Sequence, residues 1–339
     1  MTEAFSRHAD ITLWVASMGG KKKEVLESYG VAGDLSIKEL PKLSGILWPK
    51  SLFRALAFRR IVRKAPPETA FYTRDLLLAF FLSFLLLRFR ANFFFECHSL
   101  GKFPKMIYKK VFQSARGVVS TNKAKAEVIG SVYGVDANRI YVAPNGFDAS
   151  LFDALPPRAE TRQKLGLSQD AKIVLYAGSL QSWKGVDVID DLAKLLPDVS
   201  FIVLGATKEK KENNLLMLPA VSSRVVPQYL RAADILIAPY RTDSERARLY
   251  FSPIKIMEYL ASGTPVVATR LSAIEELPGS FAITFADIYK LDDFNNAINT
   301  VLERHEEYDV RAKDARRAVE ILDWKSRADQ IIVFMQKTL

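Results

Sequence analysis

The stretch from Ser252 to Thr269 reads SPIKIMEYLASGTPVVAT. Its first two residues, Ser252-Pro253, precede residues that suit a short helix, Gly263-Thr264-Pro265 ends that helix, and Val266-Val267-Ala268 predicts a short buried strand. A helix N-terminus collects unpaired N–H groups and a partial positive charge, which favours an anion such as a diphosphate. Glu258, about a turn and a half into the helix, carries a carboxylate that can accept hydrogen bonds from a ribose diol. Spacing alone leaves open an ordinary βαβ element whose Glu258 points to solvent.

Outward from this stretch, apolar strand-like runs alternate with helical patterns in both halves of the chain. Such alternation predicts an α/β protein with a parallel, doubly wound sheet in each half, that is, two Rossmann-like domains that meet at a cleft. Pro156-Pro157 and the polar helix expected at 159–165 have the composition of a linker. The expected strands are 11–16, 35–40, 70–72, 92–97, 117–120, 140–142, 172–176, 200–204, 235–238 and 265–268, and the other expected helices are 21–29, 50–64, 76–87, 123–133, 186–196, 228–232 and 254–261.

Length and composition set the class of protein. The 339 residues have room for two domains, and 49% apolar with 25% charged residues is typical of a soluble globular chain. The single cysteine, Cys97, excludes an intrachain disulfide framework and favours a reducing compartment. Met1 to Asp10 lacks the apolar core of a secretory signal. The apolar run Leu76 to Leu87 is too short to span a bilayer and predicts a buried helix, or one that partly touches a membrane surface.

The positive charge lies in the first half. Residues 1–150 hold 23 Lys and Arg against 12 Asp and Glu, whereas residues 151–339 are nearly balanced. The excess predicts either a solvated basic surface or contact with an anionic acceptor, lipid headgroups or nucleic acid. Lys50 to Lys64 is a basic amphipathic helix that either packs on a sheet or lies on an anionic membrane face, and Lys102 to Lys110 is again basic with interleaved apolar residues. No stacking platform or recognition helix is apparent, so nucleic acid is not the expected partner.

Two further positions carry candidate chemistry. Lys184 lies in the turn Gly178–Gly185 (GSLQSWKG), where glycines let the backbone approach a ligand and the lysine can neutralise a phosphate. The alternative is a turn with a surface lysine. His98 follows the expected strand 92–97 directly, and ligands of open α/β sheets bind outside the carboxyl ends of strands, although a lone histidine is more often structural. No Asp-x-Asp motif is present to hold a divalent metal.

In order and context, these segments resemble the nucleotide-sugar glycosyltransferases of the GT-B fold, family 4 (group 1). Nearly the whole chain takes part in the resemblance. The segments that carry it are FYTRDLLLA (71–79), FFFECHSL (93–100), APNGFDASLF (143–152), YAGSLQSWKGVD (176–187), AADILIAPY (232–240), SPIKIMEYLASGTPVVAT (252–269) and WKSRADQIIVFM (324–335).

The resemblance implies a domain plan. Residues 1–147 would form an acceptor-binding Rossmann-like domain, residues 148–322 a nucleotide-sugar-binding one, and residues 323–339 a helix that crosses back to the first domain. It also implies transfer with retention of anomeric configuration and no metal or other cofactor besides the nucleotide-sugar substrate.

The resemblance also implies roles for single residues. Glu258 would bind the nucleotide ribose, Lys184 would stabilise the departing diphosphate, and His98 would face the transferred sugar or the acceptor, so that His98 and Lys184 are the catalytic candidates. The donor-binding candidates are Gly178, Ser179, Lys184, Ser252, Pro253, Ile254, Lys255 and Glu258, and the acceptor-side candidates are Arg74, Glu96 and His98.

The function that this resemblance implies is transfer of a sugar from a nucleotide-sugar to a glycan or lipid-linked acceptor in cell-envelope or surface polysaccharide or glycolipid synthesis. The expected place is the cytoplasm, peripheral to the inner face of the membrane, with the basic first half holding an anionic surface. The alternative is a pseudo-enzyme that binds nucleotide or sugar without turnover.

Three departures from the family pattern bear on these expectations. Tyr250 stands where the family often has a first carboxylate, which puts recognition of the sugar in doubt. Ser179 stands where an arginine often follows the glycine of the phosphate turn, which leaves more of the charge to Lys184. The residues up to Ser17 resemble the end of the family's first helix and its second strand, so the first strand and its glycine-rich loop would be absent.

Overall fold

The structure is a computed structural model that describes residues 2–7, 10–15, 36–39, 50–86, 92–243 and 251–339. The chain forms two compact units, described separately below. Unit 1 comprises the residues up to Pro144 together with Trp324–Leu339, and unit 2 comprises Asn145–Asp323. The helix expected at 21–29, Gly19-Gly20 and Tyr250 lie outside the described residues. Both units carry a parallel sheet with helices, as the α/β prediction requires.

The sheet of unit 1 is parallel, with strand order β3-β4-β5-β6. Its central strand β4 buries Phe93, Phe94 and Phe95 in succession, because a parallel strand that is covered on both faces has no polar side. Strands β1 (Thr12–Val15) and β2 (Ser36–Glu39) pair with each other in a separate parallel ladder. The bounds of the sheet are β3 Ala70–Thr73, β4 Asn92–Cys97, β5 Gly117–Ser120 and β6 Ile140–Val142.

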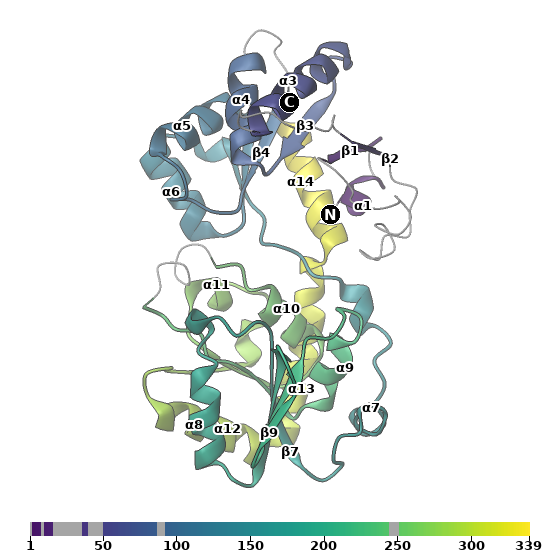
Figure 1. The fold of residues 1–339 in the computed structure, drawn as a ribbon, viewed down its shortest axis with the longest axis vertical. Helices are drawn as coiled ribbons and strands as arrows, with labels where there is room; N and C mark the ends of the chain where they lie inside the picture. The colour runs from purple at the N-terminus through teal and green to yellow at the C-terminus, as the bar shows by residue number, and fades with distance from the viewer. Residues whose placement is uncertain (1, 8–9, 16–35, 40–49, 87–91, 244–250) are drawn as a thin grey trace. The chain divides into compact units, whose positions relative to one another are not determined.

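Helix α14 (Trp324–Thr338), drawn in yellow in Figure 1, completes the core of unit 1. Its Ile331 and Phe334 pack with Phe94 of β4 and Val119 of β5. Gly117 makes this approach feasible, since a Cβ there would lie 2.7 Å from the Phe334 ring. The other helices of unit 1 are α1 (Thr2–Phe5), α3 (Lys50–Lys64), α4 (Leu76–Leu86), α5 (Lys105–Ser114) and α6 (Lys123–Tyr133).

Unit 2 contains a seven-stranded sheet with the order β13-β12-β11-β7-β8-β10-β9. From β7 the sheet extends through β8 and β10 on one side and through β11, β12 and β13 on the other. The order of the strands therefore reverses between β7 and β11. Such a reversal is the point at which open α/β sheets bind ligands. The strand bounds are β7 Lys172–Ala177, β8 Val199–Ala206, β9 Lys210–Glu212, β10 Leu215–Pro219, β11 Ile235–Ala238, β12 Val266–Thr269 and β13 Ile283–Ala286.

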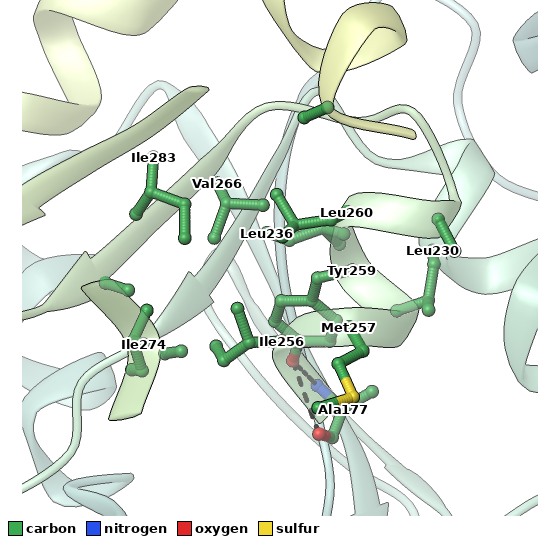
Figure 2. Close-up of a cluster of buried hydrophobic side chains, with 14 of the residues drawn as sticks. Ala177, Leu230, Leu236, Ile256, Met257, Tyr259, Leu260, Val266, Ile274 and Ile283 are labelled. Atoms are coloured by element: carbon green, nitrogen blue, oxygen red, sulfur yellow. Dashed lines mark hydrogen bonds between the residues drawn. The ribbon is translucent and has the colours of Figure 1, made fainter. Parts of the chain in front are cut away.

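Helices cover both faces of this sheet. On one face, α10 (Ile254–Ala261) buries Ile256, Met257, Tyr259 and Leu260 together with strand residues such as Leu236 and Val266 (Figure 2). On the other face, α8 (Asp187–Leu195) and α12 (Leu291–Glu303) pack against Val174 and Ile237. Alternate residues of the strands therefore enter two separate cores, as in a doubly wound fold. The remaining helices are α7 (Arg158–Leu165), α9 (Val226–Ala232), α11 (Ser272–Glu275) and α13 (His305–Val319).

Two predictions for unit 2 are wrong in detail. The sheet is not entirely parallel, because the three-residue edge strand β9 runs antiparallel to β10. The stretch that was expected to be a linker is part of the unit. Arg162 of α7 is buried, and its guanidinium donates 2.8 Å to the Ala232 carbonyl and 2.7 Å to Asp234. The polar composition of this stretch did not indicate that it packs on the unit, because the side chain that it buries is a charged arginine.

The two crossings of the chain between units lie side by side within unit 2. The Phe147 amide donates to the Leu322 carbonyl at 3.4 Å, and Phe147 forms a parallel bridge with Asp323. In the part of the chain that the structure describes, no helix is long and apolar enough to cross a membrane.

Candidate active site

The turn after β7 places Gly178 and Lys184 at the carboxyl edge of the sheet in unit 2. The Gly178 amide donates 2.9 Å to the carbonyl of Leu204 in the neighbouring strand β8. A short 3₁₀ helix, Ser182–Lys184, follows and ends at Gly185. Gly185 has a φ of 64°, and a Cβ there would lie only 1.7 Å from the Pro239 carbonyl oxygen after β11. The turn therefore packs closely against the end of β11, at the point where the strand order reverses.

This close approach gives a testable prediction for Gly185→Ala. We expect the substitution to lower the free energy of unfolding by about 2–4 kcal/mol, from the positive φ and the overlap with the Pro239 carbonyl together. The matched control is Gly166→Ala, since Gly166 has a φ of 66° and nothing within 4 Å of the added carbon. It should cost only about 1 kcal/mol. Thermal melts of both variants measure the difference, and equal losses would contradict the packing argument.

Lys184 lies over the turn rather than away from it. Its Nζ is 2.7 Å from the Ser179 hydroxyl and 5.5 Å from the centre of the Trp183 ring. Trp183 in turn stacks on Tyr240 after β11, with ring centroids 5.6 Å apart. These contacts hold the lysine at the mouth of the turn.

The start of α10 adjoins this turn. Tyr259 of α10 accepts a hydrogen bond from the Ala177 amide at 2.7 Å and lies 3.3 Å from the Ala177 carbonyl, as the dashed lines in Figure 2 show. This contact fixes the end of β7 against the helix. The Ser252 hydroxyl, just ahead of α10, is buried and has no hydrogen-bond partner in the described part of the chain. Because the amides of a first helical turn lack intrahelical partners, the helix start adds donors beside this hydroxyl.

Lys255 occupies a cage of tyrosine rings. Its Nζ is buried and has no hydrogen-bond partner among the residues that the structure describes. It lies 3.9 Å from the ring centre of Tyr176, 4.7 Å from that of Tyr240 and 5.8 Å from that of Tyr259. The faces of aromatic rings attract a cation and offer it no hydrogen bond. The cage therefore keeps the side-chain amine of Lys255 at the turn, and the rings give it no hydrogen-bond acceptor.

Burial shifts the ionisation of two groups on α10. Burial, and then the nearby charge of Lys184, hold the pKa of Lys255 well below its usual range. Burial raises the pKa of Glu258 to about 7, opposed by the charge of Lys255. Glu258 is half-buried, so its carboxylate does not simply point into bulk solvent. Two neighbouring groups that titrate away from their ordinary values are typical of a binding or catalytic site.

The donor-binding candidates of unit 2 are thus brought together around one turn and one helix start. A Cβ added at Gly178 would lie 3.7 Å from the stem of Lys255, Ser179 bonds to Lys184, and Ser252, Pro253 and Glu258 belong to α10 or its approach. Ile254 differs, because its side chain packs on the hydrophobic core and its amide donates 3.0 Å to the Ser252 carbonyl.

In unit 1, Glu96 is the centre of a buried polar network. It accepts hydrogen bonds from Tyr72 at 2.7 Å and from Arg327 of α14 at 2.5 Å. These partners, with His98, hold the pKa of Glu96 at about 2 in spite of its burial. Arg327 also donates 2.6 Å to the Pro144 carbonyl. Glu96, proposed from the sequence as an acceptor-side residue, is engaged in fastening α14 to the sheet.

His98 lies at the carboxyl end of β4 and is half exposed. Its Nε2 is 3.1 Å from the Glu96 carboxylate, which orients the ring. The buried Lys125 donates 2.9 Å to the His98 carbonyl and fixes the backbone at this point. Arg74, the remaining acceptor-side candidate, is exposed directly after β3. The structure therefore joins His98 to Glu96 and leaves Arg74 on the surface.

Sequence reasoning missed the residues that position these groups. The three tyrosines around Lys255 come from three different elements, and Arg327 is 231 residues from its partner Glu96. A signal existed only for Arg327, as a charged residue on the otherwise apolar side of the terminal helix. Among the described residues, no group of three or more His, Cys, Asp or Glu side chains is placed to hold a metal ion.

Comparison with known proteins identifies the family. The family model for glycosyl transferases group 1 matches residues 157–318, and that for glycosyltransferase family 4 matches residues 4–151. The chain belongs to family 4, group 1. Together the two models of this glycosyltransferase family span nearly the whole chain.

Solved structures agree with a GT-B fold for this family 4 member. A glycosyltransferase from Rickettsia africae has a TM-score of 0.79 at 17% identity, covering 99% of this chain and 93% of the other. Anabaena HepE in complex with UDP-glucose has a TM-score of 0.73 at 19% identity, covering 99% and 94%. The predicted fold of two Rossmann-like domains is confirmed.

Curated relatives match only part of the chain. A D-inositol 3-phosphate glycosyltransferase from Xylanimonas cellulosilytica is 29% identical over 187 residues, which are 49% of this chain and 43% of the relative. The chain thus spans less than half the length of this relative.

Proposed function

We propose that this family 4 member transfers a sugar from a nucleotide-sugar donor to an acceptor with retention of configuration. The observation that carries the proposal is the convergence of Lys184, Lys255 and the start of α10 at the reversal of strand order in unit 2. A pyrophosphate suits such a place, because helix amides, the Lys184 ammonium and the amine of Lys255 lie at the same turn. The structural likeness to a protein bound to UDP-glucose supports a nucleotide-sugar as the ligand.

The chemistry follows from the charges. Breaking a glycosyl–phosphate bond leaves negative charge on the diphosphate and oxocarbenium character on the sugar. Lys184 at the mouth of the turn and the amides of α10 are placed to stabilise the first of these. Glu258 would accept hydrogen bonds from the ribose hydroxyls. In this proposal no metal ion takes part, so side chains and backbone supply the positive charge.

We propose that the residues of the acceptor site belong to unit 1. We assign His98 to the transferred sugar or the acceptor, held in place by Glu96, with Arg74 as an exposed charge directly after the neighbouring strand β3. The acceptor we propose is a glycan or lipid-linked saccharide of cell-envelope or surface polysaccharide or glycolipid synthesis. The location we propose is the cytoplasm, at the inner face of the membrane, where the basic first half of the chain would contact an anionic surface.

A screen of UDP-, GDP- and ADP-sugars tests the proposal. One nucleotide-sugar should raise the melting temperature and be consumed when an acceptor extract is added. Binding without any hydrolysis or transfer would instead support the pseudo-enzyme, for which Tyr250 in place of a carboxylate is the relevant sequence feature. Stabilisation by none of the three donors would contradict both functions.

Glu258→Ala gives the first prediction for this site. Removing the carboxylate should weaken binding of the stabilising nucleotide by about 10- to 100-fold, since hydrogen bonds to a charged group contribute about 1.5–3 kcal/mol. Titration calorimetry measures the loss. Glu275→Ala is a matched control on α11 of the same unit, because the Glu275 side chain is exposed and pairs with Arg270. An unchanged dissociation constant for the Glu258 variant would remove Glu258 from the donor site.

The raised pKa of Glu258 predicts a pH-dependent affinity. In the free protein the carboxyl is largely protonated below about pH 7 and ionised above it. Only the ionised form accepts from both ribose hydroxyls, so nucleotide affinity should rise by up to about tenfold from pH 6 to pH 8. The dissociation constants of Glu258→Gln and of the wild type are measured at each pH, and their ratio is taken. Protonation of the nucleotide affects both proteins equally and therefore cancels in this ratio. A ratio that stays constant across this range would contradict the assignment.

A further inference from the structure

A cluster of exposed apolar and basic side chains lies on α4 and α5 of unit 1. Met106 is 73% exposed, Phe84 54% and Phe103 37%, which is unusual for large apolar residues so close together in a fold. Lys102, Lys109 and Lys110 accompany them. We call these six residues the α4–α5 patch.

The patch is a continuous surface. The Lys110 ammonium lies 4.8 Å from the centre of the Phe84 ring, which joins α5 to α4. Met106 and Lys110 are four residues apart on α5 and so share one helix face, opposite the buried Tyr108, Val111 and Phe112. Every residue from Gly101 to Met106 is exposed.

Acidic side chains are almost absent around it. Residues 76–126 contain nine Lys and Arg, of which Lys125 is buried, and a single acid, Glu96. Glu96 is buried and paired with Arg327, so it does not offset the surface charge. Exposed apolar groups among lysines match the two requirements of a lipid interface, which are insertion below the headgroups and attraction to anionic headgroups.

The basic helix α3, which the sequence singled out for membrane contact, fits these requirements less well. Its Phe58 packs edge-on against Trp14 and Phe71, and its Val62 is buried. Of its apolar side chains that the structure describes, only Leu56 is exposed. The described side chains of α3 therefore offer charge without a group of apolar side chains to insert, whereas the α4–α5 patch offers both.

We propose that the α4–α5 patch docks this protein on an anionic lipid bilayer, with Phe84, Phe103 and Met106 entering the interface and the lysines contacting lipid phosphates. The proposal names the surface behind the peripheral location given above, and it does not depend on transfer activity. It can therefore fail while the glycosyltransferase function holds, and the reverse is also true.

Co-sedimentation of the full chain with vesicles tests the proposal. Vesicles of phosphatidylglycerol and phosphatidylcholine should bind the protein, pure phosphatidylcholine should bind it weakly, and added salt should weaken the binding. Phe103→Ser with Met106→Ser, and separately Lys102→Glu with Lys109→Glu, should each lower the partition coefficient at least about tenfold. Melting temperatures and nucleotide binding of the variants, measured without vesicles, should match the wild type because all four side chains are exposed.

Matched controls separate this surface from others. Phe281→Ser, and Lys208→Glu with Lys211→Glu, change equally exposed residues of unit 2 and should leave vesicle binding unchanged. Arg60→Glu with Lys64→Glu tests α3 and should have the smaller effect. The proposal is overturned if the wild type does not bind anionic vesicles, if charge in the lipid makes no difference, or if the α3 variant loses binding while the patch variants keep it. Loss of binding in the unit 2 controls would overturn it as well.

Discussion

Lys184→Met should lower kcat by about 10²- to 10³-fold. The ammonium is the cation at the mouth of the phosphate turn, 2.7 Å from Ser179, and the negative charge that it would stabilise grows as the glycosyl–phosphate bond breaks. Removing one preorganised donor to such developing charge costs about 2.7–4 kcal/mol of barrier height in enzymes. Ser179 brings no positive charge of its own, so the loss at Lys184 has no substitute within the turn.

Steady-state kinetics with the identified donor measure this effect. KM should rise less than kcat falls, because the interaction strengthens in the transition state. Lys208→Met changes an exposed lysine of the same unit and should leave both constants unchanged. A wild-type kcat in Lys184→Met would exclude Lys184 from the catalytic machinery.

Arg327→Met should destabilise unit 1 by about 3–5 kcal/mol. The substitution leaves the Glu96 carboxylate buried without its cation, and breaking one side of a buried pair carries that cost. It also removes the hydrogen bond to the Pro144 carbonyl. Hydrogen exchange of the β4 and α14 amides reports on this unit alone, which a global melt of a two-unit protein does not.

The control and the pH dependence sharpen the prediction. Arg317→Met removes an exposed arginine of unit 2 and should cost little, since exposed ion pairs contribute about 0–1 kcal/mol. Glu96→Gln combined with Arg327→Met should recover part of the loss, because no buried charge remains. The pKa of Glu96 is about 2 in the folded state against an ordinary 4.5, so its stabilisation is present above pH 4.5 and declines as the pH falls towards 2. Equal stabilities of the single and double variants would contradict the pairing argument.

Much of the fold followed from local patterns. Runs such as Phe93–Phe95 are apolar on every residue because their strand is covered on both faces, and that pattern can be recognised without knowing the neighbours. The start of α10 was likewise evident from Ser252-Pro253 and the break at Gly263. Segments whose identity depends on pairing were missed, namely β9 and β10, where β9 consists of three exposed charged residues. Helices α12 and α13 were also missed.

The candidate site was predictable only in its polar residues. Lys184, Lys255 and Glu258 lie in turns or at a helix start, where short motifs carry information. Tyr176, Tyr240 and Tyr259 look like ordinary core residues in the sequence, and only the fold brings their rings around one ammonium. The same limit applies to Arg162 and Arg327, whose burial depends on carboxylates distant in the chain.

The place of α14 has a consequence for synthesis on the ribosome. Ile331 and Phe334 complete the core of unit 1, yet they emerge only after all of unit 2 has been made. Unit 2 is continuous in sequence and holds its two core layers without them, so it can fold while translation is still under way. Unit 1 can complete its core only after α14 has been synthesised. Until α14 is made, the apolar surfaces of β4 and β5 that it covers are exposed, which favours aggregation of the nascent chain.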